Sequence, residues 1–285
     1  MGLKIAVPSK GRLRDKTLEL LEAAGFGTIY ADPRALIIPT KYNGIDLVFV
    51  RPEDIPWIVE SGAAQMGITG HDYVVEAGVE VEEVLDLGYG NSRLVLAVPN
   101  NLGIEKAEEL PEGTRVATKF VNISKKFINE RNLKWKIIKI SGSAEIMPGL
   151  GAADAIIDIS STGTTLRLHG LKAIEVLLES SARLIVNKEF VNDDKVELVK
   201  TMIEGVLKAR KKKLLMMNVP ERSLKEVLSV LPSMSGPTIS KVESTEPMWE
   251  VIVAIDESEL NDVIMKVKSS GARDILVVNI ERLIP

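Results

Sequence analysis

The sequence alternates short apolar runs with amphipathic stretches over its first two thirds, and the joins are rich in Gly, Pro, Asn and Ser. Short apolar runs are typical of buried strands, whereas apolar residues that recur every three to four positions are typical of helices. Their alternation predicts an α/β fold. A strand over 4–8 and a helix over 14–24, which Gly25 ends, form the first such unit.

Two lobes are expected in this part of the chain. A length of 285 residues is enough for more than one domain. The strand expected over 89–99 is followed by a polar segment, where a chain commonly enters a second lobe. A strand over 183–186 would then return to the first lobe. We therefore expect lobe I to comprise 1–90 and 181–211, lobe II to comprise 91–180, and a cleft to lie between them.

The remaining residues, 212–285, follow a different order of elements. Strands are expected over 214–219, 238–242, 249–255 and 274–280, with one helix after the first strand and another after the third. This β-α-β-β-α-β order predicts a ferredoxin-like domain. Small domains of this kind often sense a ligand, although the fold alone does not establish that role.

Composition excludes several classes of function. Lys and Arg total 36 against 40 Asp and Glu, so the net charge of −4 leaves no cationic excess for a nucleic-acid backbone. The basic run 211–213 ends a predicted helix and is interpreted as a solvated charge run rather than a nucleic-acid patch. The absence of Cys excludes disulfides and thiolate metal sites. Without a long apolar run or a signal-peptide pattern, we expect a cytoplasmic protein with no membrane partner.

The most informative segment lies between residues 145 and 166. The strand expected over 155–159 delivers Asp158 at its end and opens into a hydroxyl-rich loop before a helix. The loop consists of Ser160, Ser161, Thr162, Gly163, Thr164 and Thr165. Backbone N–H groups and hydroxyls at a helix start form a site for a phosphate monoester, and Asp158 would accept hydrogen bonds from sugar hydroxyls. The alternative is an ordinary βα turn in which a hydroxyl caps the helix.

Several cations are candidates for binding anions. Lys10 and Arg12 stand beside the positive end of the first helix, where the macrodipole makes cations unfavourable unless an anion joins them. Side chains that extend into solvent are the alternative. Arg51, Arg93 and Arg115 each flank a predicted strand, near the cleft rim expected of open α/β sheets, although any one of them is compatible with a plain surface position.

Other polar motifs are less specific. Asp72, in the segment 67–72, is compatible with a helix cap or with a contact to a base or ribose. The two histidines, His71 and His169, are interpreted as structural because neither has an evident acid–base partner in the sequence. There is no P-loop motif, and the glycine pairs of this sequence lack the third glycine of a dinucleotide fingerprint.

A longer pattern runs through the hydroxyl-rich segment. It consists of Glu145, Gly151, Ala153, Ile156, Asp158, Ile159, Thr162, Gly163, Thr165 and Leu166. These residues and their spacing resemble the signature of the ATP phosphoribosyltransferase family, the first enzymes of histidine biosynthesis. The resemblance extends to the segments 8–13 and 67–72 and to the C-terminal domain, so it covers nearly the whole chain and indicates the long form of the family.

The resemblance implies a fold and a set of ligands. Two lobes built like type II periplasmic binding proteins would precede a histidine-sensing domain, in a homo-oligomer such as a hexamer or dimer. The loop would hold the 5′-phosphate of phosphoribosyl pyrophosphate (PRPP), with Asp154 and Asp158 near the ribose and Glu145 in the same site. Mg²⁺ accompanies the pyrophosphate in the family, and because no carboxylate cluster suggests a dedicated cage, its protein ligands are left unassigned.

The resemblance also implies the reaction. Adenine N1 of ATP would attack C1 of PRPP as pyrophosphate leaves, giving N1-(5-phosphoribosyl)-ATP. A ring-nitrogen lone pair needs no strong base, so alignment and electrostatics would provide catalysis without a dedicated catalytic residue. The candidate contacts for ATP and pyrophosphate are Lys10, Arg12, Arg51, Asp72, Arg93 and Arg115.

Histidine, as an inhibitor, would bind the C-terminal domain. The candidate contacts, at joins that ordinary turns explain equally well, are Ser235, Thr238, Ala272 and Asp274. Two other functions remain alternatives: a small-molecule-binding protein without catalysis, and a PRPP-dependent transferase with another acceptor.

Overall fold

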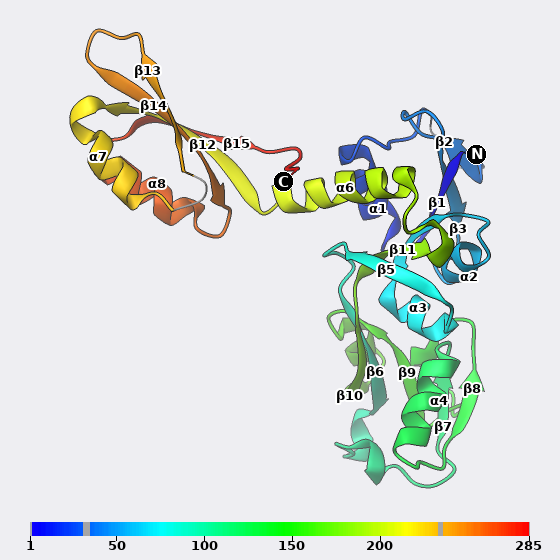
Figure 1. Cartoon of the computed structure of the whole chain (residues 1–285). Helices are drawn as coiled ribbons and strands as arrows, with labels where there is room; N and C mark the ends of the chain where they lie inside the picture. Colours follow the sequence, from blue (N-terminus) through cyan, green and yellow to red (C-terminus); the bar gives the residue numbers. More distant parts are fainter. Residues whose placement is uncertain (1, 31–34, 233–235, 285) are drawn as a thin grey trace. The chain divides into compact units, whose positions relative to one another are not determined.

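The computed structural model describes residues 2–30, 35–232 and 236–284 and divides into two compact units (Figure 1). The first unit comprises 1–22 and 26–198, and the second comprises 23–25 and 199–285. The first unit contains two α/β lobes, each with its own sheet. None of the helices in the described parts of the chain combines the length and hydrophobicity that a bilayer crossing requires.

The sheet of lobe I has six strands in the order β2-β3-β1-β4-β11-β5. In chain order these strands are β1 (Leu3–Pro8), β2 (Ile37–Pro39), β3 (Ile45–Val50), β4 (Met66–Gly70), β5 (Val81–Asp86) and β11 (Ala182–Asn187). Strands β3, β1 and β4 are parallel, and β11 lies antiparallel between β4 and β5. The helices of this lobe are α1 (Arg14–Ala23), α2 (Ile55–Glu60) and α3 (His71–Ala77), with a short 3₁₀ turn over Lys188–Phe190.

The sheet of lobe II has the order β10-β6-β9-β7-β8. Its strands are β6 (Ser92–Pro99), β7 (Arg115–Thr118), β8 (Lys136–Lys139), β9 (Ala155–Ser160) and β10 (Leu171–Ser180). Its helices are α4 (Val121–Glu130) and α5 (Thr164–Leu168), with 3₁₀ turns over Asn100–Leu102, Ala107–Glu109 and Ala144–Ile146.

Both sheets share one plan, in which three parallel strands are followed by an antiparallel strand and an edge strand. In lobe I this series is β3-β1-β4-β11-β5, and in lobe II it is β8-β7-β9-β6-β10. The antiparallel strand β11 follows all five strands of lobe II in the sequence, as expected for a chain that returns to its first lobe. The two-lobed fold implied by the resemblance to the ATP phosphoribosyltransferase family is confirmed.

Burial on both faces explains why the strands of lobe II read as continuous apolar runs. Along β6, Leu94 and Leu96 pack into a core with Phe120 and Phe127. The intervening Val95 packs on the opposite face, in a second core that includes Leu166 of α5. Strands β7 and β9 are parallel neighbours, so their carboxyl ends meet at one edge of the sheet.

Three strands were not expected from the sequence: β2, β5 and β10. Strand β2 is short, and β5 carries charged residues at three of its six positions, so neither forms a clear apolar run. Strand β10 is an edge strand with two register shifts, which break its alternation. Helix α2 begins at Ile55 rather than at Pro52, and its helix-start proline is Pro56.

The C-terminal domain has the expected ferredoxin-like order. Its elements are β12 (Lys212–Pro220), α7 (Glu221–Val230), β13 (Thr238–Val242), β14 (Met248–Asp256), α8 (Leu260–Ser269) and β15 (Arg273–Asn279), and α6 (Asp194–Ala209) precedes them. All pairings in the sheet β13-β14-β12-β15 are antiparallel. Val227 of α7 and Val263 of α8 pack with Leu215 of β12 in one core, so both helices bury their apolar stripes against the sheet.

Candidate active site

The hydroxyl-rich loop joins β9 to α5 and exposes most of its side chains. Gly163 adopts φ +73° directly before α5, a conformation that suits glycine because it lacks a Cβ. Its N–H donates to Ser160 Oγ at 3.1 Å, and Thr162 and Thr164 share a hydroxyl hydrogen bond of 2.9 Å. The turn is thus held by its own side chains, while Ser161 and Thr165 are exposed and line a cavity.

A cavity of about 280 Å³ lies over this loop. Its lining comprises Arg12, Glu145, Ile156, Asp158, Ile159, Ser160, Ser161, Thr162, Gly163, Thr164, Thr165 and Leu166. The structure therefore brings together every loop residue expected to bind PRPP, two carboxylates of lobe II and one cation of lobe I.

Asp158 stands at the carboxyl end of β9 in a mostly buried position. Burial raises the pKa of its carboxyl group above the ordinary value, the N–H of Ile159 and the nearby Lys119 oppose this rise, and Glu145 adds to it. The N–H of Ile159 donates to Asp158 Oδ1 at 2.8 Å. A cation or hydroxyl donors beside this carboxylate would stabilise its charged form.

Two cations near the loop were missed from the sequence. Lys119 follows the last residue of β7, next to β9, and its Nζ lies 5.0 Å from the ring centroid of Phe120. Arg167, in the last turn of α5, donates to the carbonyl of Thr162 at 3.3 Å and to Thr164 Oγ1 at 3.1 Å. The usable signal for Lys119 was its place directly after a parallel strand, at the same sheet edge as Asp158.

Arg12 reaches the cavity from the segment between β1 and α1. Its Nη1 donates to the carbonyl of Gly90 at 3.0 Å, and its Nη2 lies 3.6 Å from Asp72 Oδ1. The expectation that this cation is unfavourable unless an anion joins it from outside is therefore wrong, because the carbonyl of Gly90 and the carboxylate of Asp72 already balance its charge. Lys10 and Arg51 are exposed at the same end of the sheet, where the N–H of Ser9 donates to the carbonyl of Val50 at 2.7 Å.

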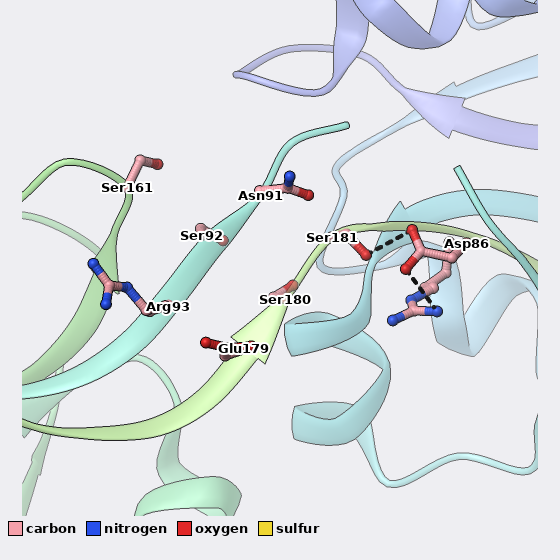
Figure 2. Close-up of a pocket in the computed structure, with 9 residues that line it drawn as sticks. Asp86, Asn91, Ser92, Arg93, Ser161, Glu179, Ser180 and Ser181 are labelled. Carbon is pink, nitrogen blue, oxygen red and sulfur yellow. Dashed lines mark hydrogen bonds and ion pairs between the residues drawn. The ribbon is translucent and has the colours of Figure 1, made fainter. Parts of the chain in front are cut away.

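A second cavity, of about 480 Å³, lies along the two segments that connect the lobes (Figure 2). It is lined by Asp86, Asn91, Ser92, Arg93, Ser161, Glu179, Ser180, Ser181 and Arg183. Figure 2 shows Arg93 and Ser161 on the same side of it. Since Ser161 also lines the first cavity, the two spaces adjoin at the loop, and Arg93 is the expected cation that lines the second.

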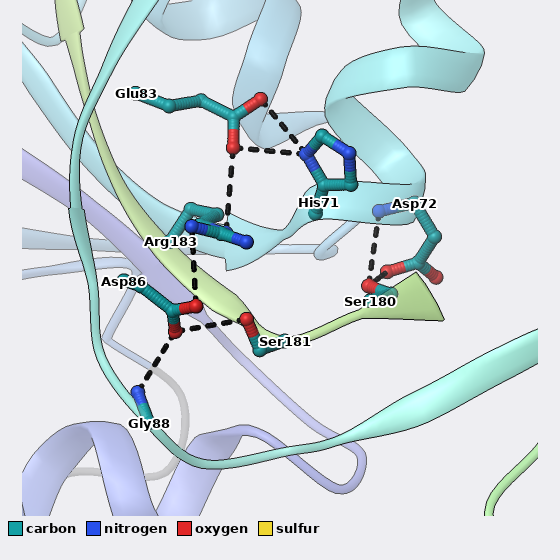
Figure 3. A network of polar contacts seen from close by, with 8 residues as sticks. All are labelled: His71, Asp72, Glu83, Asp86, Gly88, Ser180, Ser181 and Arg183. Carbon is teal, nitrogen blue, oxygen red and sulfur yellow. Dashed lines mark hydrogen bonds and ion pairs between the residues drawn. The ribbon is translucent and has the colours of Figure 1, made fainter. Parts of the chain in front are cut away.

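A polar network stabilises the connecting segments (Figure 3). Arg183 lies 3.2 Å from Asp86 and 3.5 Å from Glu83, and His71 Nδ1 lies 2.9 Å from Glu83. Burial alone would raise the pKa of Asp86, but a backbone N–H, the hydroxyl of Ser181 and the Arg183 guanidinium hold it below its usual value. His71 thus has an acidic partner, distant in sequence, that fits the structural role expected for it.

Asp154 and Arg115 are not brought to the loop. They stand at the amino ends of β9 and β7, whereas the loop follows the carboxyl end of β9. Arg115 Nη2 donates to Asp154 Oδ1 at 2.8 Å, its backbone N–H donates to Oδ2 at 2.8 Å, and its Nη1 donates to the carbonyl of Gly151 at 3.0 Å. The geometry describes an ion pair that joins two strands rather than a substrate contact.

This pair leads to a first prediction. The hydrogen bond from Arg115 lowers the pKa of Asp154, so the pair stabilises the fold above the unfolded pKa of the carboxyl group and this contribution is lost as the pH falls. Asp154→Asn is expected to reduce the free energy of unfolding at pH 7 by about 0.5 to 1 kcal/mol, since the pair is partly exposed. Chemical unfolding at pH 7 and pH 3 measures this difference, which should shrink at the lower pH. A large loss of PRPP affinity in a stable Asp154→Asn protein would contradict the structural role.

The expected histidine contacts are not gathered in one place. Ser235 lies outside the described residues. Thr238 opens β13 and Asp274 lies in β15, which are the two opposite edge strands, so three strand spacings of about 4.8 Å separate them. Ala272 is buried in the core of the domain. Asp274 adopts φ +48° and accepts a hydrogen bond from Asn218 Nδ2 at 3.1 Å.

The sequence was compared with known families and relatives. A family model described as ATP phosphoribosyltransferase matches residues 51–206, and one described as HisG, C-terminal domain, matches residues 209–282. Two relatives named ATP phosphoribosyltransferase, from Ignicoccus hospitalis and Sulfurisphaera tokodaii, are 63% and 52% identical over 99% of this chain and 100% of their own length.

A solved structure is also similar. It is the ATP phosphoribosyl transferase (HisG:HisZ) complex from Thermotoga maritima, with a chain 29% identical to this one and a TM-score of 0.61. The match covers 98% of that chain but 71% of this one. The uncovered share is close to that of the C-terminal domain.

Proposed function

The chain belongs to the ATP phosphoribosyltransferase family, which carries out the first step of histidine biosynthesis from ATP and PRPP, and on this premise we propose that the loop between β9 and α5 binds the 5′-phosphate of PRPP. One observation carries the proposal. The same cavity joins the exposed hydroxyls of 160–165 to Asp158 and Glu145 of lobe II and to Arg12 of lobe I. Hydroxyls suit the phosphate, and carboxylates suit the ribose hydroxyls.

The size of the cavities supports separate places for the two substrates. A single drug-sized ligand commonly occupies about 300 to 1,000 Å³. The loop cavity, at about 280 Å³, is too small for PRPP and ATP together. We assign ATP to the adjoining cavity along the connecting segments, where Arg93 and Ser161 would face it. Lys10 and Arg51, exposed at the neighbouring sheet edge, are candidates for its phosphates.

The chemistry follows from placing the two substrates against each other. The lone pair of adenine N1 forms the bond to C1 of PRPP while the bond from C1 to the pyrophosphate oxygen breaks, so the leaving group takes the electron pair. No protein base is required. Arg12 and Lys119 would stabilise the charge that develops on pyrophosphate, and alignment of the two substrates supplies the remainder of the rate enhancement.

The residues of the loop cavity fit Mg²⁺. No group of three or more His, Cys, Asp or Glu residues able to hold a metal occurs in the described ranges, but Glu145 and Asp158 line one cavity. Burial raises the pKa of Asp158, and Glu145 adds to this rise, so the charged form of Asp158 is disfavoured. Mg²⁺ is commonly held by one or two carboxylates together with substrate phosphates. When bound, it would neutralise charge on the pyrophosphate, while Glu145 and Asp158 hold it beside the ribose.

The C-terminal domain is proposed to bind histidine as a feedback inhibitor. The match of residues 209–282 to the C-terminal domain of the family supports a role separate from the two lobes. Among the expected contacts, Asp274 is the accessible carboxylate that would face the amino group of the ligand. A homo-oligomer and a cytoplasmic location stay predictions.

The loop assignment is tested by Thr162→Val and Thr165→Val, which remove a hydroxyl and nearly preserve the shape of the side chain. Each loses a hydrogen bond to a charged phosphate, so kcat/KM for PRPP should fall about 10- to 100-fold with the unfolding midpoint little changed. Thr245→Val, at an exposed threonine of the C-terminal domain, is the matched control. Pyrophosphate release with ATP, with other purine nucleotides and with no acceptor is the measurement. Unchanged PRPP kinetics in both loop variants would contradict the assignment of the loop to the 5′-phosphate. Equal rates with other acceptors would favour a PRPP-dependent transferase with a different acceptor.

A further inference from the structure

Asp72 is a fully buried carboxylate beside the loop cavity. It lies in the first turn of α3, where Ser180 Oγ donates to its Oδ1 at 2.5 Å and its own N–H donates to Ser180 Oγ at 3.1 Å (Figure 3). Its second oxygen, Oδ2, has no hydrogen-bond partner among the described residues. With its side chain 0% exposed, Asp72 has no surface with which to touch a base or ribose.

The charge of Asp72 needs a partner, because an ionised carboxylate is strongly disfavoured in a buried position without one. The cation that the structure supplies is Arg12, whose Nη2 lies 3.6 Å from Asp72 Oδ1 and whose side chain is 33% exposed. Arg12 is also the lobe I residue that lines the loop cavity. Asp72 is therefore buried, whereas Arg12, its partner, lines the proposed substrate site.

The pair is attached to both segments that connect the lobes. Arg12 Nη1 donates to the carbonyl of Gly90 in the segment between β5 and β6. Ser180, which holds Asp72, ends β10 just before the chain returns to lobe I. The position of the guanidinium is thus fixed by groups on both connections as well as by the segment that carries Arg12.

Gly70 leaves the space that this arrangement uses. A Cβ at Gly70 would lie 2.1 Å from Asp72 Oδ1, far inside van der Waals contact. The φ of Gly70 is −77°, which any residue adopts. The glycine is therefore required by the place of the carboxylate and not by the backbone conformation.

We propose that Asp72 is a positioning residue that holds the guanidinium of Arg12 toward the phosphates of the substrate. The proposal rests on the proposed function, in which Arg12 contacts those phosphates. A guanidinium has five N–H groups, so the bonds to Gly90 and Asp72 leave donors for phosphate oxygens. Holding a charged donor in place before the substrate arrives removes the cost of orienting it in the transition state.

A double-mutant cycle tests the proposal with the full chain. Asp72→Asn keeps the shape and the acceptor for Ser180 but removes the charge, and it should lower kcat/KM for PRPP about 10- to 100-fold, as expected when a catalytic group is displaced by about 1 Å. In an Arg12→Gln background, the same substitution should change kcat/KM less than about 3-fold, because nothing remains to be positioned. The double variant should also unfold at a higher temperature than Arg12→Gln alone, since it no longer buries an unpaired carboxylate.

Two further variants keep the test decisive if Asp72→Asn folds poorly. Gly70→Ala retains the carboxylate and displaces it, so it should reduce kcat/KM in the wild-type background and have little effect beside Arg12→Gln. Thr40→Val is the structural control, because it removes a buried hydroxyl that donates to the carbonyls of Tyr42 and Ile45, away from the cavity. It should lower the unfolding midpoint and leave kcat/KM unchanged.

The outcomes separate the two levels of the proposal. If Arg12→Gln has normal PRPP kinetics, the assignment of Arg12 to the substrate fails. If Arg12→Gln is impaired but Asp72→Asn and Gly70→Ala are normal, or cost the same factor in both backgrounds, the positioning role of Asp72 is overturned while the proposed function stands.

Discussion

Arg12→Gln is expected to lower kcat/KM for PRPP about 100- to 1,000-fold, the loss typical of removing one preorganised donor that stabilises developing negative charge. Gln retains donors but carries no charge. Lys10→Gln is the matched control, because Lys10 is a cation two residues away that does not line the loop cavity, and its effect should stay below about 10-fold. Steady-state kinetics with PRPP varied at saturating ATP measures both. Equal losses in the two variants would show that general positive charge, rather than the placement of Arg12, is what matters.

The same variant should be less stable than the wild type. From the sequence alone, removing a cation from the positive end of α1 should leave the stability unchanged or slightly increased. The buried Asp72 reverses this expectation, because Arg12→Gln leaves its carboxylate without a cation, at a cost of about 1 to 3 kcal/mol. Urea unfolding of the unliganded protein provides the value. A more stable Arg12→Gln protein would mean that the contact with Asp72 contributes nothing.

Truncation after Arg210 is expected to abolish inhibition by histidine while transferase activity survives. The cut falls between α6 and β12, so it removes the whole ferredoxin-like sheet and leaves both lobes and the loop cavity complete. A solved family chain in the HisG:HisZ complex is matched over 98% of its length by 71% of this one, so a shorter chain of the family is folded in that complex. Initial rates across a histidine titration, compared with the full-length protein, measure the change.

A point variant separates the loss of a domain from the loss of a ligand site. Asp274→Asn in the full-length chain removes one charge from the C-terminal domain without disturbing its core. It should weaken inhibition and leave the uninhibited rate unchanged, because coupling between two sites is lost when either site is lost. If the truncated protein were active and still inhibited at the full-length concentration of histidine, the inhibitor would have to act at the lobes.

Much of the architecture was predictable because its signals are local. The central strands are apolar on both faces, as in β9, and the helices of the C-terminal domain repeat their apolar residues at helical spacing. Strands β5 and β10 were not predicted, because an edge strand exposes one face and tolerates charges there. Its sequence therefore resembles a loop or an irregular helix. Their assignment required the neighbouring strand, which no local pattern supplies.

The candidate site was predictable along one loop and not across the sheet. The segment 145–166 contains residues close in sequence, but residues 155–159 of β9 separate Asp154 from the loop, so this one segment contributes to both edges of the sheet. Lys119 was not predicted as a site residue, because its neighbour Asp158 is distant in sequence. The two residues are adjacent only through the parallel pairing of β7 and β9. The burial of Asp72 likewise depends on Ser180, 108 residues away.

The placement of β11 constrains the order in which the protein can fold during synthesis. Because β11 lies between β4 and β5, the sheet of lobe I lacks an interior strand until residues 182–187 have left the ribosome. Lobe II lies between these parts in the sequence, so it can complete its five strands first. Closing such a distant pairing is slow and leaves unpaired strand edges exposed meanwhile. We therefore expect that a nascent chain halted near residue 150 does not form a native lobe I, because it lacks β11, and that it depends on chaperones.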